Sequence, residues 1–141
     1  MSVTKENSAP RFTDLVRAHQ EADSAICPQR LVLEHVTSRW GVLVLLNLLD
    51  RPYRFSELRR AIGKVSEKML TQTLQTLERD GLVHREAHAV IPPRVDYSLT
   101  PLGREAAERV REVAEWTQAR LDRVMAARAE YDARREERAA G

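Results

Sequence analysis

Apolar residues recur at intervals of three and four positions along most of the chain, a spacing that predicts amphipathic helices. The first predicted helix runs from Arg11 to about Cys27, and Pro28 suits the first turn of a second helix. The second helix ends just before Ser38, which is placed to cap a third over residues 39–49. Because that third segment is apolar on nearly every face, we expect it to lie in the core.

Two further helices are predicted around a short turn. Ser56 is expected to cap a helix through about Ile62, after which Gly63-Lys64-Val65 turns the chain. Ser66 is expected to cap a longer helix, which ends at Gly81 because glycine suits the left-handed C-terminal position. Two helices joined by a short turn that contains glycine are typical of a helix-turn-helix. The inward positions of the longer helix repeat at intervals of four and three: Leu70, Leu74 and Leu77.

A hairpin and a long helix follow. Residues 82–86 and 95–99 are short β-prone runs, and they predict a two-stranded wing. Thr100 and Pro101 are an N-cap and a first-turn proline, and apolar positions then recur at helical spacing as far as Val124. The element order predicts a winged helix from pattern alone.

The predicted fold class is therefore mainly α with a small β-hairpin (α+β), a winged helix-turn-helix with N- and C-terminal dimerisation helices. We expect a flexible arm over residues 1–10 because they are polar and aperiodic. Residues 11–125 are expected to form a single domain that includes the dimerisation helices. Residues 126–141 are expected to be a charged helical tail whose last turns fray, because apolar positions are lost there.

Composition places the chain among soluble globular proteins. It has 141 residues, 43% hydrophobic and 31% charged, which suits one domain with its own core. The longest apolar stretch, residues 42–49, is too short to span a membrane, and the N-terminus lacks the apolar core of a secretory signal. The chain also has a single cysteine, which suits a reducing compartment. We therefore expect a cytoplasmic protein that does not bind membranes. The net charge of +2 does not by itself establish nucleic-acid binding.

The helix after Ser66 carries the candidate chemistry. A recognition helix needs polar side chains that can meet the donors and acceptors of the DNA major groove. An isolated polar face is more often simply solvated, but the neighbouring turn and wing favour DNA. The candidate DNA-binding residues of this helix are Ser66, Lys68, Met69, Thr71, Gln72 and Thr73, of which Lys68, Met69, Gln72 and Thr73 are the expected base contacts. Phosphate contacts are expected from Arg54, Arg59, Lys64 and Arg94, with Arg60 and Arg85 nearby, and Arg94 is placed at the wing tip.

Ordered motifs over about two thirds of the chain, from Cys27 to Trp116, resemble the HxlR-type winged-helix transcription regulators. The motifs are Cys27-Pro28, Trp40, residues 55–59 (FSELR), 66–72 (SEKMLTQ), 77–82 (LERDGL) and 92–100 (PPRVDYSLT). The resemblance implies homodimers that bind double-stranded operator DNA, in a bacterial or archaeal source. Thr73 and Gln75 stand where the resembling sequences often carry Arg, so an operator preference does not carry over.

Cys27 resembles the cysteine with which some members of that family sense electrophiles or oxidants. A small packed residue is the alternative, because the neighbouring residues do not decide between the two. His84 and His88 are four residues apart but fall on a predicted strand and loop without a carboxylate or cysteine cluster. With no phosphate loop, triad or paired carboxylates either, we predict no metal, no cofactor and no enzyme activity.

The sequence thus predicts a homodimeric, sequence-specific regulator of transcription that controls a nearby operon and could respond to an electrophile, an oxidant or a small ligand. The alternative is a winged-helix module for protein–protein interaction, or a ligand-sensing domain with DNA binding only as its output. Dimerisation is expected to use the apolar stripes at both ends, because so small a core cannot bury them. The expected interface residues are Phe12, Leu15, Val16, Val113, Trp116, Leu121 and Val124.

Overall fold

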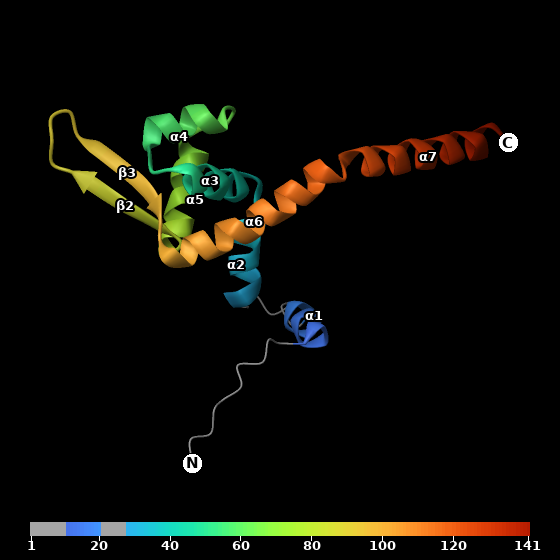
Figure 1. Ribbon diagram of the computed structural model, residues 1–141, viewed down its shortest axis with the longest axis horizontal. Coiled ribbons are helices and arrows are strands. Elements are labelled where there is room, and N and C mark those ends of the chain that lie inside the picture. The colour runs from blue at the N-terminus through green and yellow to red at the C-terminus, as the bar shows by residue number, and fades with distance from the viewer. Residues whose placement is uncertain (1–10, 21–27) are drawn as a thin grey trace, which may run out of the picture.

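The computed structural model describes residues 11–20 and 28–141, so the predicted arm and Cys27 lie outside the described residues. Helices dominate, with one small antiparallel sheet at one end of the molecule (Figure 1). The predicted fold class is confirmed. The elements in chain order are α1 (Phe12–Gln20), α2 (Pro28–Thr37), α3 (Arg39–Asp50), β1 (Tyr53–Arg54), α4 (Phe55–Ile62), α5 (Glu67–Arg79), β2 (Val83–His88), β3 (Arg94–Leu99), α6 (Pro101–Ala119) and α7 (Leu121–Ala140).

Three predicted helix starts are confirmed by their caps. In each, a hydroxyl oxygen accepts a hydrogen bond from the backbone N–H three residues later, which satisfies one of the free donors at a helix N-terminus. The pairs are Ser38 with Gly41 (3.1 Å), Ser66 with Met69 (3.1 Å) and Thr100 with Gly103 (3.0 Å).

The predicted cap of α4 is wrong. The helix begins at Phe55, one residue before Ser56, and Arg54 is its N-cap. The Arg54 backbone N–H donates to the carboxylate of Glu57 (3.2 Å), which fixes the start of the helix without a hydroxyl cap. Arg54 also pairs with Asp96 in the sheet, so a strand runs directly into the helix.

The wing is a three-stranded sheet in the order β1-β3-β2, with both pairings antiparallel. The predicted hairpin is confirmed and runs from the Val83–Leu99 pair to the His88–Arg94 pair. For residues 51–55 the sequence predicts a turn with a short extended piece, and in the structure this piece, Tyr53–Arg54, is a third strand of the sheet. Its two residues pair with Tyr97 and Asp96 of β3, so its conformation depends on a distant part of the chain.

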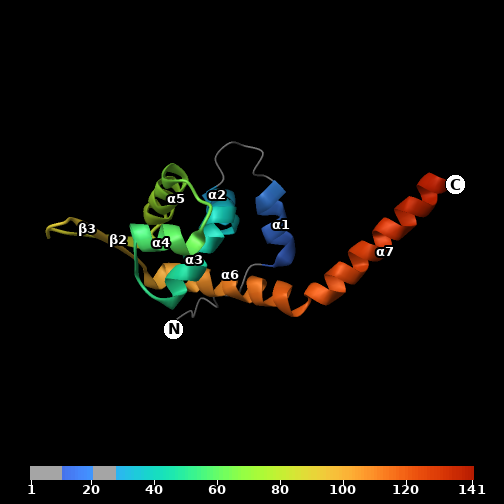
Figure 2. The same cartoon turned by 90° about the horizontal axis from the view of Figure 1, so that it is seen from above.

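The core forms around α3, as its apolar sequence predicts. Val44, Leu45 and Leu48 of this helix are buried. The helix packs against α5 on one side and α6 on the other (Figure 2). At Gly103 of α6, an added Cβ would lie 1.8 Å from the carbonyl oxygen of Leu82, so only glycine lets α6 approach the base of the wing.

The C-terminal part differs from the single long helix predicted. Arg120 has φ −110° and ψ 7°, which interrupts the helix between α6 and α7. The tail predicted to fray is helical to Ala140, because strong helix formers fill it and Arg134 pairs with Glu130 one turn away (3.6 Å). All of α7 is exposed, and it projects away from the body of the molecule (Figures 1 and 2).

Among the described residues, no single helix is long and apolar enough to cross a membrane. Helices α2 and α3 reach that composition only when taken together, and they are bent by 69° where they meet.

Candidate nucleic-acid interface

Helix α5 has two opposite faces. Leu70, Leu74 and Leu77 are buried against the core, at most 1% exposed. The other face is polar and open to solvent. The residues exposed over the first three turns are Ser66, Glu67, Lys68, Met69, Thr71, Gln72 and Gln75. Side chains of an amide, an ammonium and hydroxyl groups therefore stand together on one helix, in the arrangement that major-groove reading requires.

Two of the predicted DNA-binding residues of α5 also bond to the helix itself. The Ser66 hydroxyl accepts the Met69 N–H and so caps the helix. The Thr73 hydroxyl donates to the Met69 carbonyl (2.8 Å), and Thr73 is half-buried. Lys68, Thr71, Gln72 and Gln75 are exposed, so these polar side chains of the face can reach a ligand.

Basic side chains surround the N-terminal end of α5. Arg59 of α4 donates to the Val65 carbonyl (3.4 Å) and lies 4.0 Å from the Glu67 carboxylate. Lys64, in the turn between α4 and α5, is exposed. Arg54, at the start of α4, is exposed as well and lies 3.9 Å from Glu57. Of the predicted phosphate contacts, Arg59 and Lys64 therefore lie beside the start of α5, whereas Arg54 lies at the opposite end of α4, beside the wing.

Arg94 does not lie at the wing tip, as predicted, but at the first position of β3, beside the tip. Its guanidinium contacts the Asp96 carboxylate (3.2 Å), which also bonds to His88 Nε2 (2.9 Å). Residues two apart in a strand share a face, and His88 is directly opposite Arg94, so the sheet geometry brings the three together. The Arg94 Nε is buried and has no hydrogen-bond partner among the described residues.

Sequence reasoning missed this His88–Asp96–Arg94 cluster, although the two-residue spacing of Arg94 and Asp96 within a predicted strand is a signal for it. His84 is not part of this cluster, because it lies four residues before His88 on β2, opposite Ser98. In the part of the chain that the structure describes, no group of three or more His, Cys, Asp or Glu side chains could hold a metal ion.

Glu57 organises the basic residues at the start of α4. The backbone N–H of Arg54 donates to this carboxylate, and the Arg51 guanidinium lies 3.3 Å from it. The backbone hydrogen bond from Arg54 is the largest cause that lowers the pKa of Glu57 below its ordinary value; burial opposes it, and the charge of Arg51 and the hydrogen bond from its side chain lower the pKa further. The carboxylate thus joins the backbone N–H of Arg54 to the guanidinium of Arg51 at the start of α4.

An open cavity of about 470 Å³ separates the wing from α4. Arg54 and Ser56 line it from the helix, and Arg94 lines it from the wing. Its remaining walls are apolar: Phe55, Val90, Ile91, Pro92, Pro93 and Val95. Arg54 and Arg94 thus border one largely apolar cavity between α4 and the wing.

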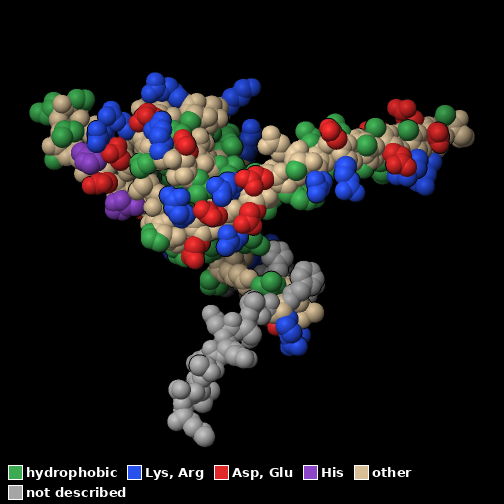
Figure 3. Space-filling model, in the orientation of Figure 1, with side chains coloured by type: hydrophobic (Ala, Val, Ile, Leu, Met, Phe, Trp, Pro, Cys, Tyr) green, Lys and Arg blue, Asp and Glu red, His purple; other side chains and the backbone are tan. Residues whose placement is uncertain are grey.

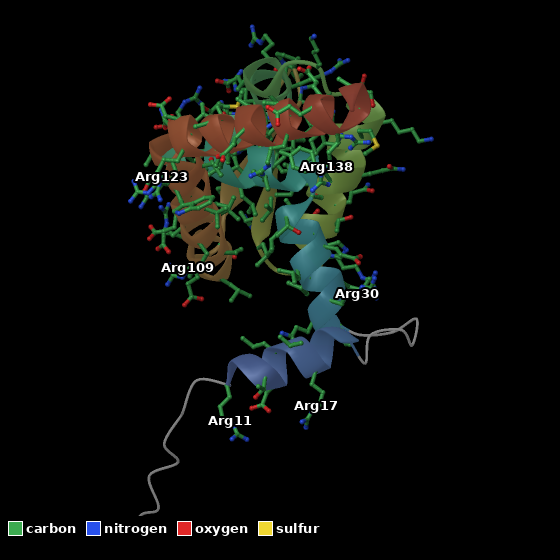
Figure 4. All side chains as sticks on the ribbon, turned by 90° about the vertical axis from the view of Figure 1, so that its right-hand side faces the viewer. Arg11, Arg17, Arg30, Arg109, Arg123 and Arg138 are labelled. Atoms are coloured by element: carbon green, nitrogen blue, oxygen red, sulfur yellow. The ribbon has the colours of Figure 1, made fainter. Side chains whose placement is uncertain are left out.

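The predicted dimer residues lie apart from this face, on α1, α6 and α7. The side chain of Phe12 is not among those described. The others are exposed large apolar residues, between 38% and 64% exposed: Leu15, Val16, Val113, Trp116, Leu121 and Val124. Arg109 and Arg123 point outward from α6 and α7, and Arg11 and Arg17 extend from α1 into solvent (Figure 4).

Comparison with known proteins agrees with this geometry. Residues 35–125 match the family described as HxlR-like helix-turn-helix. The uncharacterized HTH-type transcriptional regulator YtfH of Escherichia coli (strain K12) is 57% identical over 104 residues, which are 74% of this chain and 82% of the relative.

Similar solved structures include the following two. One is named as the transcriptional regulator ytfH from Salmonella typhimurium; it has a TM-score of 0.71 and 52% identity and covers 76% of this chain and 96% of its own. The other is the redox regulator HypR in its oxidized form, with a TM-score of 0.61 and 36% identity over 66% of this chain and 96% of its own. These two proteins and the Escherichia coli relative are all named as regulators. The chain belongs to the HxlR-like helix-turn-helix family.

Proposed function

We propose that this chain is a homodimeric, sequence-specific DNA-binding regulator of transcription that acts in the cytoplasm on a nearby operon. Helix α5 enters the major groove, and the wing contacts the adjacent backbone. Membership of the HxlR-like helix-turn-helix family supports this proposal. The names of the relatives, which are HTH-type transcriptional regulators, support it further.

The observation that carries the proposal is the division of α5 into a buried leucine face and an exposed polar face. Because Leu70, Leu74 and Leu77 fix the helix in the core, its rotation is set, and Lys68 and Gln72 stay turned toward solvent. A glutamine amide can pair with adenine in the major groove, and a lysine ammonium with guanine. Such contacts give sequence-specific binding, whereas a helix face that only contacts water makes none of them.

Affinity would come from the basic residues beside the start of α5 and at the wing. Arg59 and Lys64 lie beside the start of α5, Arg54 lies beside the wing, and Arg94 lies in it. Contacts from arginine and lysine to phosphate fix the position of a protein on the duplex and release counterions. Each residue that contacts a phosphate therefore adds about 0.9 to the slope of binding against salt.

A second copy of the chain would supply the second half-site. Two recognition helices must lie about 34 Å apart to enter successive major grooves on one side of the duplex. The surface for this contact is formed by the exposed apolar residues Leu15, Val16, Val113, Trp116, Leu121 and Val124 of α1, α6 and α7, because packing against a second copy would remove them from water. In this proposal, residues 11–125 form the domain with its dimerisation helices, and the tail over 126–141 extends beyond them.

The experiment is a gel shift with the DNA upstream of the protein's own gene, repeated over a range of salt concentrations. Specific binding is expected, with a steep fall as salt rises, while random duplex of equal length binds more weakly. No difference between the two duplexes would contradict sequence-specific binding. That result would favour the alternative, in which the winged helix binds a protein or a small ligand.

An oxidant or electrophile could control this binding through Cys27, the single cysteine of the chain. The similarity to HypR, which is named as a redox regulator, favours this input. With no second cysteine, a disulfide would join two subunits or a small thiol. Diamide is expected to change operator binding by the native chain and not by Cys27→Ser; equal responses would rule this input out.

A further inference from the structure

The tip of the wing is unusual in its chemistry. The five residues between the last paired positions of β2 and β3 are all apolar and all exposed: Ala89, Val90, Ile91, Pro92 and Pro93. Ile91 is fully exposed, at 101%, and Val90 is 52% exposed. Hairpin loops normally carry glycine, asparagine, aspartate or serine. An apolar tip therefore needs a reason outside the folding of the chain.

The tip is held on a firm base. Six residue pairs join β2 to β3, and β1 supports β3 from its other side. Asp96 bonds to both His88 and Arg94, the last pair before the tip. Pro92 and Pro93 have fixed φ angles and little freedom to collapse. The apolar residues are thus presented outward rather than folded onto the protein.

Two guanidinium groups lie behind this apolar tip, each beside a carboxylate: Arg94 beside Asp96 (3.2 Å) and Arg54 beside Glu57 (3.9 Å). Arg54 and Arg94 line the cavity directly behind it, together with Val90 and Ile91. In the space-filling view, hydrophobic side chains gather at the free end of the wing, with basic, acidic and histidine side chains between that end and the body of the molecule (Figure 3). Apolar groups in front and guanidinium groups behind fit a duplex, whose bases are apolar on their faces and whose backbone is anionic.

We propose that the wing tip is a wedge that enters the minor groove beside the α5 site and parts two stacked bases. Ile91 is the inserted side chain, and Arg54 and Arg94 meet the phosphates of the opened step. Isoleucine and proline are among the residues that unstack base steps in this way and kink the duplex. This inference rests on the proposed DNA binding and adds that the bound operator is bent.

The test uses the full-length protein and operator duplexes with 2-aminopurine placed in turn at each step that flanks the α5 site. Native protein is expected to raise the fluorescence at one step on each side, and Ile91→Ala to abolish the rise. A nick at that step lowers the free energy needed to kink the duplex. It should therefore raise the affinity of the native protein for the duplex about tenfold, and change the affinity of Ile91→Ala by no more than about twofold. Leu102→Ala, which shortens an exposed leucine at the start of α6, far from the loop, should behave as the native protein does.

The outcomes separate the two proposals. If the native chain binds no operator, both fail. If it binds without unstacking, or if nicking favours native protein and Ile91→Ala equally, the wedge alone is overturned, and the apolar tip then belongs to a protein contact. Ile91 is wholly outside the core, so a folding defect is not expected, and unchanged circular dichroism of the variant checks this.

Discussion

His35 and Asp80 join the end of α2 to the end of α5: His35 Nδ1 lies 2.5 Å from Asp80 Oδ2. Asp80 is the residue that ends α5, and its side chain is only 16% exposed. The contact spans 45 positions of sequence. It therefore fastens the C-terminal end of the proposed recognition helix to the helix that follows Cys27.

Removing this contact should loosen α5. Asp80→Asn keeps the size of the side chain and removes its charge, so we expect a loss of about 1–3 kcal/mol in the free energy of unfolding. Glu34→Gln is the matched control, because Glu34 pairs with Arg30 (3.1 Å) on an exposed helix surface, where a pair contributes about 0.5 kcal/mol. Urea denaturation measures both; similar losses in the two variants would show that the contact has no special role.

Phosphate contacts should appear in the salt dependence. Arg59→Ala and Arg94→Ala are each expected to reduce the slope of log affinity against log salt by about 0.9, and to weaken specific and random duplexes alike. Arg109→Ala, which changes an arginine that points outward from α6, should leave the slope as it is. If a variant keeps the native slope, the arginine that it lacks does not contact a DNA phosphate.

The proposed dimer should depend on Leu121. Leu121→Glu places a charge in an apolar contact and should shift the dimer toward monomer, with a sharp loss of operator binding. Leu102→Glu is the control, since Leu102 and Leu121 are almost equally exposed, at 54% and 52%, and neither substitution disturbs the core of one chain. Sedimentation gives the readout. A stable dimer of the Leu121→Glu protein would place the interface elsewhere.

Glu57 should contribute to stability in a pH-dependent way. Its pKa is lowered in the folded chain, so the ionised carboxylate stabilises the start of α4 above the ordinary value of 4.5, and this contribution is lost as pH falls through the lowered value. Native protein should therefore melt at a higher temperature than Glu57→Gln at neutral pH. The difference should shrink under acid, and a difference that grows there would contradict this assignment.

Local chemistry made much of the fold predictable. Ser38, Ser66 and Thr100 cap helices with bonds to residues three positions later, so their roles depend on short sequence windows. Gly81 likewise takes the expected left-handed conformation, with φ 76°. The family resemblance was visible in the same local motifs.

Features that depend on distant partners were not predictable in this way. Strand β1 is only two residues long and exists because β3 lies beside it. The helix breaks at Arg120 without a proline or glycine at that position, and the apolar repeat continues across the break. The sequence therefore predicts one continuous helix there. The exposed face of α5 could be predicted from the spacing of its leucines, which is local. The position of Arg94 beside Asp96 and His88 depends on the pairing of β2 with β3, which the sequence does not show.

The central claim is that α5 reads base sequence, and Gln72 tests it most directly. The measurement is the affinity of native protein and Gln72→Ala for the operator and for random duplex, at one salt concentration. Gln118→Ala, an exposed glutamine of α6, is the control. We predict a loss of about 1–3 kcal/mol on the operator, a much smaller loss on random duplex, and no change for the control. Equal losses on operator and random duplex, or none on either, would contradict base reading by this residue.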